Sequence, residues 1–203
     1  MSKIGILGGS FNPLHNLHIE LGLAALRDFD LDKILVMPSG RPPHKTLAEG
    51  ATDEDRVNMV KAAISKYDKF ELDLFEMESK EQTYTYKTLS IYKEKYAGDD
   101  LFFIMGEDSL DKFEIWVNPD IVSRKATILV GPRAKTDENI TLDEKLKAAS
   151  KKFDGDFFKL SSPKLNISST IVRDLIKTKG DFESLVPEEV SSYIKEKGIY
   201  NYV

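Results

Sequence analysis

Hydrophobic positions along the chain follow two alternating patterns. Short, continuous apolar runs are typical of strands buried on both faces. They predict strands at Lys3–Leu7, Lys33–Met37, Phe70–Leu72, Leu101–Met105, Ala126–Val130 and Phe157–Lys159. Apolar residues repeated every three or four positions are typical of amphipathic helices. They predict helices at Leu17–Arg27, Thr52–Ser65, Thr85–Tyr96, Asp108–Lys112, Leu142–Lys151, Ser168–Lys177 and Pro187–Lys197.

This alternation of strands and helices predicts an α/β fold with a doubly wound, mainly parallel sheet. Such sheets bind ligands beyond the carboxyl ends of their strands, where the strand order reverses. We therefore expect the loops after Leu7, Met37, Met105 and Val130 to share one rim. No internal repeat or linker rich in Pro, Gly or Ser divides the chain, so we interpret all 203 residues as a single domain. The helices from about Ser168 onward would form a small helical subdomain.

Composition and charge narrow the classes of protein. A net charge of −5 leaves no basic face that would favour nucleic acid as a partner. Because the chain has no cysteine, disulfides, thiolate catalysis and cysteine zinc sites are excluded. It shows no charged leader with an apolar core, and no apolar run approaches a membrane span. We therefore expect a soluble, cytoplasmic protein with no membrane partner.

The most informative segment joins the first predicted strand to the first predicted helix. It contains Gly8, Gly9, Ser10, Phe11, His15 and His18. A glycine turn between a strand and a helix start binds anions, because backbone N–H groups and the helix dipole converge there. His15 and His18 are three residues apart, so both lie on one face of the first turn and can donate N–H groups to phosphate oxygens. The segment lacks the spacing of a P-loop or a dinucleotide fingerprint. The alternative is a tight turn with packed histidines.

A second anion site is predicted near the other end of the chain, at Ile167–Arg173. Ser168 or Ser169 can cap the helix that follows, and its exposed N–H groups and hydroxyls can bind an anion with Arg173 one turn further along. The alternative is an ordinary capped helix with a surface arginine. Two phosphate-binding helix starts would suit a triphosphate.

These two segments resemble the signatures of the nicotinate and nicotinamide mononucleotide adenylyltransferase family, Rossmann-like members of the nucleotidyltransferase superfamily. Gly8–His18 resembles the Gly-Gly-x-Phe-x-Pro-x-His-x-x-His signature, and Ile167–Arg173 resembles Ile-Ser-Ser-Thr-x-x-Arg. The resemblance extends over nearly the whole chain. Its further blocks are Pro42–Lys45, Thr83–Leu89, Phe103–Leu110 with Phe113 and Trp116, and Val186–Tyr200.

The resemblance implies transfer of AMP from ATP to nicotinate mononucleotide in NAD biosynthesis, which forms nicotinate adenine dinucleotide and pyrophosphate. It implies Mg²⁺ held mainly by the phosphates, and His15 and His18 as catalytic residues. The implied ATP-binding residues are Gly8, Gly9, Ser10, Phe11, His15, His18, Gly106, Asp108, Ile167, Ser168, Ser169 and Arg173. The implied residues for the nicotinate substrate are His44, Lys45, Thr85, Trp116 and Arg133.

Several alternatives stay open at this point. Trp116, the only tryptophan, can stack on a pyridine ring or belong to the core, and Asp108 can contact the nucleotide or cap a helix. Leu17 and Lys87 replace a glycine and an aspartate that are common in the family. The acceptor could instead be nicotinamide mononucleotide or another phosphorylated compound such as phosphopantetheine. A further alternative is an ATP-binding sensor module without chemistry, and a homo-oligomer is possible.

Overall fold

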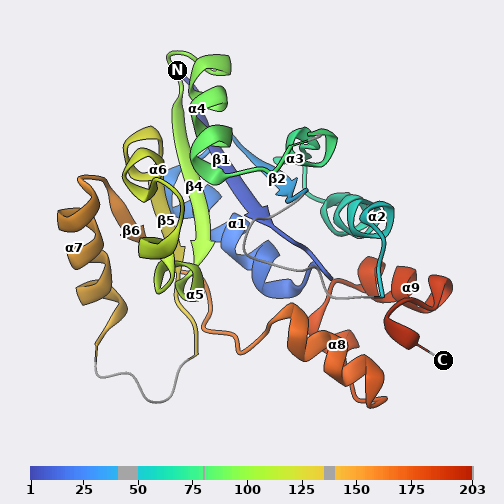
Figure 1. Ribbon diagram of the computed structural model, residues 1–203. Coiled ribbons are helices and arrows are strands. Elements are labelled where there is room, and N and C mark those ends of the chain that lie inside the picture. Colours follow the sequence, from blue (N-terminus) through green and yellow to red (C-terminus); the bar gives the residue numbers. More distant parts are fainter. Residues whose placement is uncertain (41–49, 80, 135–139, 203) are drawn as a thin grey trace.

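The computed structural model of the chain describes residues 1–40, 50–79, 81–134 and 140–202. Within them, one six-stranded sheet has the order β3-β2-β1-β4-β5-β6, and all neighbouring strands are parallel (Figure 1). The strands are β1 (Lys3–Gly9), β2 (Lys33–Pro38), β3 (Phe70–Leu72), β4 (Asp100–Gly106), β5 (Thr127–Gly131) and β6 (Phe157–Lys159). All six predicted strands are present, which confirms the predicted α/β, Rossmann-like fold class.

The helices are α1 (Asn16–Phe29), α2 (Asp53–Ile64), α3 (Phe75–Glu78), α4 (Thr85–Lys95), α5 (Glu107–Leu110), α6 (Pro119–Lys125), α7 (Leu142–Phe153), α8 (Ser169–Lys177) and α9 (Glu188–Lys197). Most helices lie between successive strands, and α8 and α9 follow the last strand. Short 3₁₀ helices are η1 (Phe113–Ile115), η2 (Glu183–Leu185) and η3 (Ile199–Asn201). The sequence did not predict α3 and α6, because a helix of only one or two turns is too short to show an apolar repeat.

Two hydrophobic cores lie on opposite faces of the sheet. Residues of α1, α2, α8 and α9 pack on one face with Val36 and Ile104, and residues of α4, α6 and α7 pack on the other with Leu35 and Met105 (Figure 1). Successive side chains of a strand point to opposite faces, so neighbours such as Leu35 and Val36 enter different cores. Burial on both faces explains why the inner strands β1, β2, β4 and β5 read as continuous apolar runs. The edge strands β3 and β6 are only partly buried, so the expectation of burial on both faces is wrong for them.

The strand order reverses between the neighbours β1 and β4. From β1 the chain continues to β2 and β3 on one side, and from β4 it continues to β5 and β6 on the other. Leu7 of β1 lies opposite Ile104 of β4, and β1 continues beyond this pair through Gly8 and Gly9. The loops after β1, β2, β4 and β5 leave from one edge of the sheet because these strands are parallel, as the sequence predicted. A crevice at this reversal is where doubly wound sheets bind ligands.

The C-terminal helices belong to the first of the two cores. Val172 of α8 and Val190 of α9 are fully buried in the cluster that also contains Leu14 of the β1–α1 loop. The chain's last helices therefore pack beside the loop that follows its first strand (Figure 1). The interpretation as a single domain with a helical subdomain from about Ser168 stays a prediction. Across the described part of the chain, no helix has the length and apolarity needed to span a membrane.

Candidate active site

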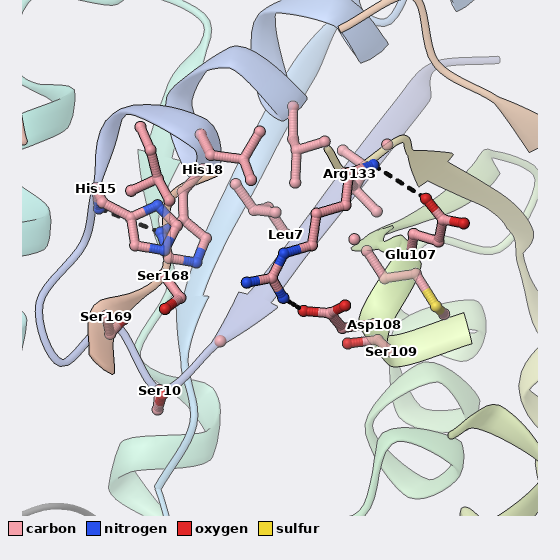
Figure 2. A pocket seen from close by; sticks show the side chains of 18 of the residues that line it. Leu7, Ser10, His15, His18, Glu107, Asp108, Ser109, Arg133, Ser168 and Ser169 are labelled. Carbon is pink, nitrogen blue, oxygen red and sulfur yellow. Dashed lines mark hydrogen bonds and ion pairs between the residues drawn. The ribbon is translucent and has the colours of Figure 1, made fainter. Parts of the chain in front are cut away.

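A cavity of about 610 Å³ lies at the carboxyl ends of β1, β4 and β5 (Figure 2). It is bounded by the starts of α1 and α8 on one side and by α5 and the loop after β5 on the other. Its lining includes most of the predicted ATP-binding residues and two of those predicted for the nicotinate substrate. These are Gly8, Gly9, Ser10, His15, His18, Gly106, Asp108, Trp116, Arg133, Ile167, Ser168, Ser169 and Arg173.

Phe11 is the predicted ATP-binding residue that does not line this cavity. Its side chain is only 1% exposed and packs in the core on the α1 side of the sheet. Its ring meets the His18 ring edge-on at 5.0 Å between centroids, and a Cβ added at Gly9 would lie 2.9 Å from it. Phe11 therefore packs against His18 and the glycine turn from the core side. An apolar ring is more stable in the core than in a polar cavity.

The two histidines of the first signature lie against each other at the start of α1. His15 is the N-cap residue, and the two rings stack with 3.7 Å between centroids (Figure 2). The backbone N–H of His15 donates to Nδ1 of His18 at 3.2 Å. An Nδ1 that accepts a hydrogen bond leaves the proton of the neutral ring on Nε2. The fold therefore selects the His18 tautomer whose Nε2 is a donor.

His15 is held as a neutral imidazole. Its side chain is 5% exposed, and its Nδ1 is buried without a hydrogen-bond partner. Burial lowers the pKa of His15 to about 3; a backbone hydrogen bond opposes this shift in part, and the positive charge of Arg133 adds a smaller lowering. Desolvation has this direction because it disfavours the charged form. In the unliganded protein, His15 thus offers hydrogen bonds near neutral pH without the positive charge that a protonated imidazole would add.

The start of α8 is attached to the β1–α1 loop. Ser168 is its N-cap, accepting from the backbone N–H of Ile171 at 3.2 Å, which confirms the predicted cap. The Ser169 hydroxyl donates to the carbonyl oxygen of Pro13 at 2.9 Å, and Arg173 donates to that of Asn12 at 2.6 Å. Ser168 and Ser169 thereby lie beside the two histidines (Figure 2). The two predicted anion sites, from opposite ends of the chain, face one cavity.

The opposite wall of the cavity carries paired charges. Arg133, after β5, forms an ion pair with Asp108 of α5 (Figure 2). The carboxylate of Glu107 is buried and accepts from the backbone N–H of Arg133 at 3.0 Å and from Nζ of Lys145 at 3.1 Å. Gly106, not Asp108, is the N-cap of α5, so the alternative role of Asp108 as a cap is wrong. Among the described residues, no three histidine, aspartate or glutamate side chains gather as a metal site.

A second cavity of about 200 Å³ adjoins the first. The two share Gly8, Gly9, Ser10, Phe103, Ser109 and Trp116 in their linings. Trp116 is partly buried and packs on Phe103 and Phe113, with ring centroids 6.1 and 5.3 Å away. It thus belongs partly to the core and partly to the wall of both cavities. Thr85, at the start of α4, lines the second cavity.

Two predicted substrate residues and the two replacements in the family signatures remain to be placed. His44 and Lys45 lie outside the described residues. Leu17 is buried and lines the first cavity. Lys87 is exposed and lies 5.7 Å above the Tyr84 ring, and the second cavity does not include it. The replacement at Lys87 therefore falls on the outer side of α4.

Sequence reasoning missed two residues that hold the site loops. Arg56 is fully buried and donates to the carbonyl oxygens of Ser10 and Ser39 at 2.8 and 2.9 Å, which joins the loops after β1 and β2. The Tyr200 hydroxyl is buried and donates to Oδ1 of Asn12 at 2.6 Å. A signal for Arg56 was present, because it lies on the same helical face as apolar Met59.

Comparison with known proteins adds to this geometry. A family model of cytidylyltransferase-like proteins matches residues 6–175. The chain is 40% identical to a probable nicotinate-nucleotide adenylyltransferase of Clostridium tetani over 98% of the chain and 100% of that protein. A probable nicotinate-nucleotide adenylyltransferase of a Synechococcus species is 35% identical over 98% of the chain and 96% of that protein.

Solved structures share the fold. The Plasmodium falciparum nicotinic acid mononucleotide adenylyltransferase complexed with NaAD matches with a TM-score of 0.79 at 22% identity, covering 100% of this chain and 99% of that one. A putative nicotinate-nucleotide adenylyltransferase from Vibrio parahaemolyticus matches with a TM-score of 0.70 at 20% identity, covering 100% and 98%.

The reversal of strand order beside two helix starts and a large cavity defines a nucleotide-binding α/β protein of the Rossmann-like type. The family resemblance seen in the sequence is confirmed by full-length relatives. The chain belongs to the cytidylyltransferase-like family and, within it, to the nicotinate-nucleotide adenylyltransferases.

Proposed function

We propose that this chain transfers AMP from ATP to the 5′-phosphate of nicotinate mononucleotide, in a step of NAD biosynthesis. The products are nicotinate adenine dinucleotide and pyrophosphate. One observation supports this above others: two helix starts from opposite ends of the chain face one large cavity, which adjoins a smaller cavity across a tryptophan. Such a pair of compartments suits two nucleotides that must meet end to end.

The larger cavity has the groups that a triphosphate requires. Backbone N–H groups at the starts of α1 and α8 attract anions, as do the dipoles of both helices. His15 and His18 add hydrogen bonds, and the guanidinium of Arg173 adds positive charge at the same end of the cavity. We assign the β- and γ-phosphates to Ser168, Ser169 and Arg173, and the reacting α-phosphate to His18.

The smaller cavity suits a pyridine ring that carries a carboxylate. Trp116 offers an aromatic surface for stacking. At the start of α4, Thr85 follows an N-cap residue, Tyr84, whose side chain makes no capping hydrogen bond. The first N–H groups of a helix have no partner within it, so they are donors for an anion such as a carboxylate. This arrangement favours the acid over the amide.

The chemistry requires no activated side chain. The second pKa of a phosphate monoester is about 6, so the acceptor phosphate is largely dianionic at neutral pH and can attack the α-phosphorus directly. The bond to the leaving pyrophosphate breaks as the new phosphoanhydride bond forms. The chain's residues hold the two polyanions in line and stabilise the charge that develops on the α-phosphate and pyrophosphate oxygens.

A divalent cation accompanies the nucleotide in this proposal, and we assign it as Mg²⁺. The carboxylates that border the cavity already have cationic or backbone partners: Asp108 pairs with Arg133, and Glu107 contacts Lys145 and the Arg133 backbone. This donor set fits an ion bound mainly by phosphate oxygens and water, as Mg²⁺ prefers. When bound, the ion would neutralise phosphate charge.

The decisive experiment compares acceptors. The purified protein is given ATP and Mg²⁺ with nicotinate mononucleotide, nicotinamide mononucleotide, phosphopantetheine or no acceptor, and pyrophosphate release is followed. We expect the highest kcat/KM with nicotinate mononucleotide. A preference for the amide would overturn the acceptor assignment, and ATP binding without turnover on any acceptor would favour the sensor module. The cytoplasmic location and the homo-oligomer stay predictions.

A further inference from the structure

The wall of the smaller cavity contains a carboxylate to which the family resemblance gave no role. Glu76, on the short helix α3, lines this cavity together with Thr83, Thr85 and Thr88. Its Oε1 accepts from the Thr88 hydroxyl at 2.8 Å, and its Oε2 accepts from the Thr83 hydroxyl at 3.2 Å. Both oxygens of one carboxylate are thus bound to hydroxyls that flank Thr85 in the sequence.

These two hydrogen bonds fix the start of α4. Thr83 lies before the helix and Thr88 lies in its first turn, where its N–H donates to the carbonyl oxygen of Tyr84 at 3.1 Å. The N-cap residue Tyr84 makes no side-chain cap, so the usual local restraint on a helix start is absent here. The carboxylate of Glu76 supplies a restraint from a different element instead.

The helix that carries Glu76 is itself held firmly. A Cβ added at Gly40, in the loop after β2, would collide with the carbonyl oxygen of Glu76, so the two backbones are in close contact. Arg56, which joins the loops after β1 and β2, also contacts Sδ of Met77 in α3 at 3.3 Å. Asp73 accepts from the backbone N–H of Phe75, the first residue of α3, at 3.0 Å. Because α3 is held in place, Glu76 can hold the start of α4 in a fixed position.

We propose that Glu76 is a positioning residue for the acceptor, a role that rests on the proposed function. By binding both threonine hydroxyls it sets the direction in which the first N–H groups of α4 face the smaller cavity. It acts through Thr83 and Thr88, whose hydroxyls donate to its two oxygens. The carboxylate of the nicotinate ring would then bind the helix start while the Glu76 charge is shared with two donors.

The charge of Glu76 is compatible with this role. Burial, with a smaller contribution from the charge of Asp73, raises the pKa of its carboxyl. The two threonine hydroxyls offset part of this rise because they stabilise the ionised form. Without them, a partly buried carboxylate would lie unpaired beside an anionic substrate. A glutamine can keep both contacts, since its oxygen accepts from one hydroxyl and its amide N–H donates to the other. Alanine removes both.

Steady-state kinetics with nicotinate mononucleotide and ATP test the proposal. For Glu76→Ala we expect KM for the acceptor to rise about tenfold, equivalent to about 1.4 kcal/mol, with KM for ATP and kcat within about twofold. Glu76→Gln should return the acceptor KM to within about threefold of the wild-type value. The matched control is Glu78→Ala, which removes an exposed carboxylate from the same helix and should change neither KM.

Thr83→Val provides a second, milder test that does not depend on the stability of the alanine variant. It removes one of the two hydrogen bonds and should raise the acceptor KM about threefold. An unchanged acceptor KM in both Glu76→Ala and Thr83→Val, or an equal rise in both KM values, would overturn the positioning role while leaving the proposed function standing. Absence of turnover by the wild-type protein would overturn the proposed function and this inference together.

Discussion

The neutral state of His15 has a measurable consequence for stability in acid. We consider the substitution His15→Asn, which keeps a polar side chain at the N-cap of α1 but removes the titrating ring. In the folded protein the pKa of His15 is lowered to about 3, whereas a histidine exposed to water has a pKa of 6.5. Between these values the unfolded chain binds one proton more than the folded chain. Stability therefore falls as the pH falls from 6.5 toward 3, and the loss is absent above 6.5.

The magnitude follows from the two pKa values. Within this window, one extra proton on the unfolded chain lowers the free energy of unfolding by up to about 1.4 kcal/mol per pH unit. From pH 7 to pH 5, His15 accounts for a loss of about 2 kcal/mol. Other groups, such as Asp28 and Asp55 with their lowered pKa values, also lose stabilisation as the pH falls. They do so equally in both proteins, so they cancel in the difference.

Urea unfolding of both proteins at several pH values between 5 and 7.5 tests this reasoning, with far-UV circular dichroism as the signal. Between pH 7 and pH 5, we expect the free energy of unfolding of the wild type to fall by about 2 kcal/mol more than that of His15→Asn. Parallel curves for the two proteins would refute the neutral, buried state of His15. A difference in the denaturant slope would instead indicate a change in the extent of unfolding.

Substitutions at three further positions test other parts of the site. His18→Ala should lower kcat by about a hundredfold or more with unchanged circular dichroism, and near-normal turnover would remove His18 from the mechanism. Trp116→Ala should raise KM for the acceptor about tenfold through lost stacking, whereas Trp116→Phe should lose less; equal effects of both would argue against stacking. Tyr200→Phe should lower the free energy of unfolding by about 1 kcal/mol through loss of the bond to Asn12, as an earlier urea midpoint would show.

Much of the fold could be predicted because its signals are local. Apolar runs specified the six strands, of which the inner four are buried, and apolar repeats specified the longer helices. A cap at Ser168 or Ser169 could be predicted because capping depends on a few neighbouring residues, and the structure places it at Ser168. The short helices α3 and α6 escaped detection, and α3 carries Glu76. So few residues cannot display a helical period, so the sequence pattern alone did not indicate α3 and α6.

The site was predictable to a different extent at different residues. The strand–turn–helix context identified His15 and His18, which the structure brings to one cavity with Ser168. Phe11 belongs to the same motif, yet its side chain packs in the core. The spacing of a motif shows which residues are near one another, but the direction of a side chain depends on what surrounds it.

By itself, the sequence determined the parallel α/β architecture, the glycine corner after the first strand and the capped helix start near the other end, because periodicity, turn chemistry and capping act over a few residues. Tertiary structure alone decided that these two starts face one cavity, that His15 is neutral, and that Arg56 and Tyr200 fasten the loops around it. Burial, and with it the pKa of a side chain, depends on which distant segments pack together. That packing requires the complete fold.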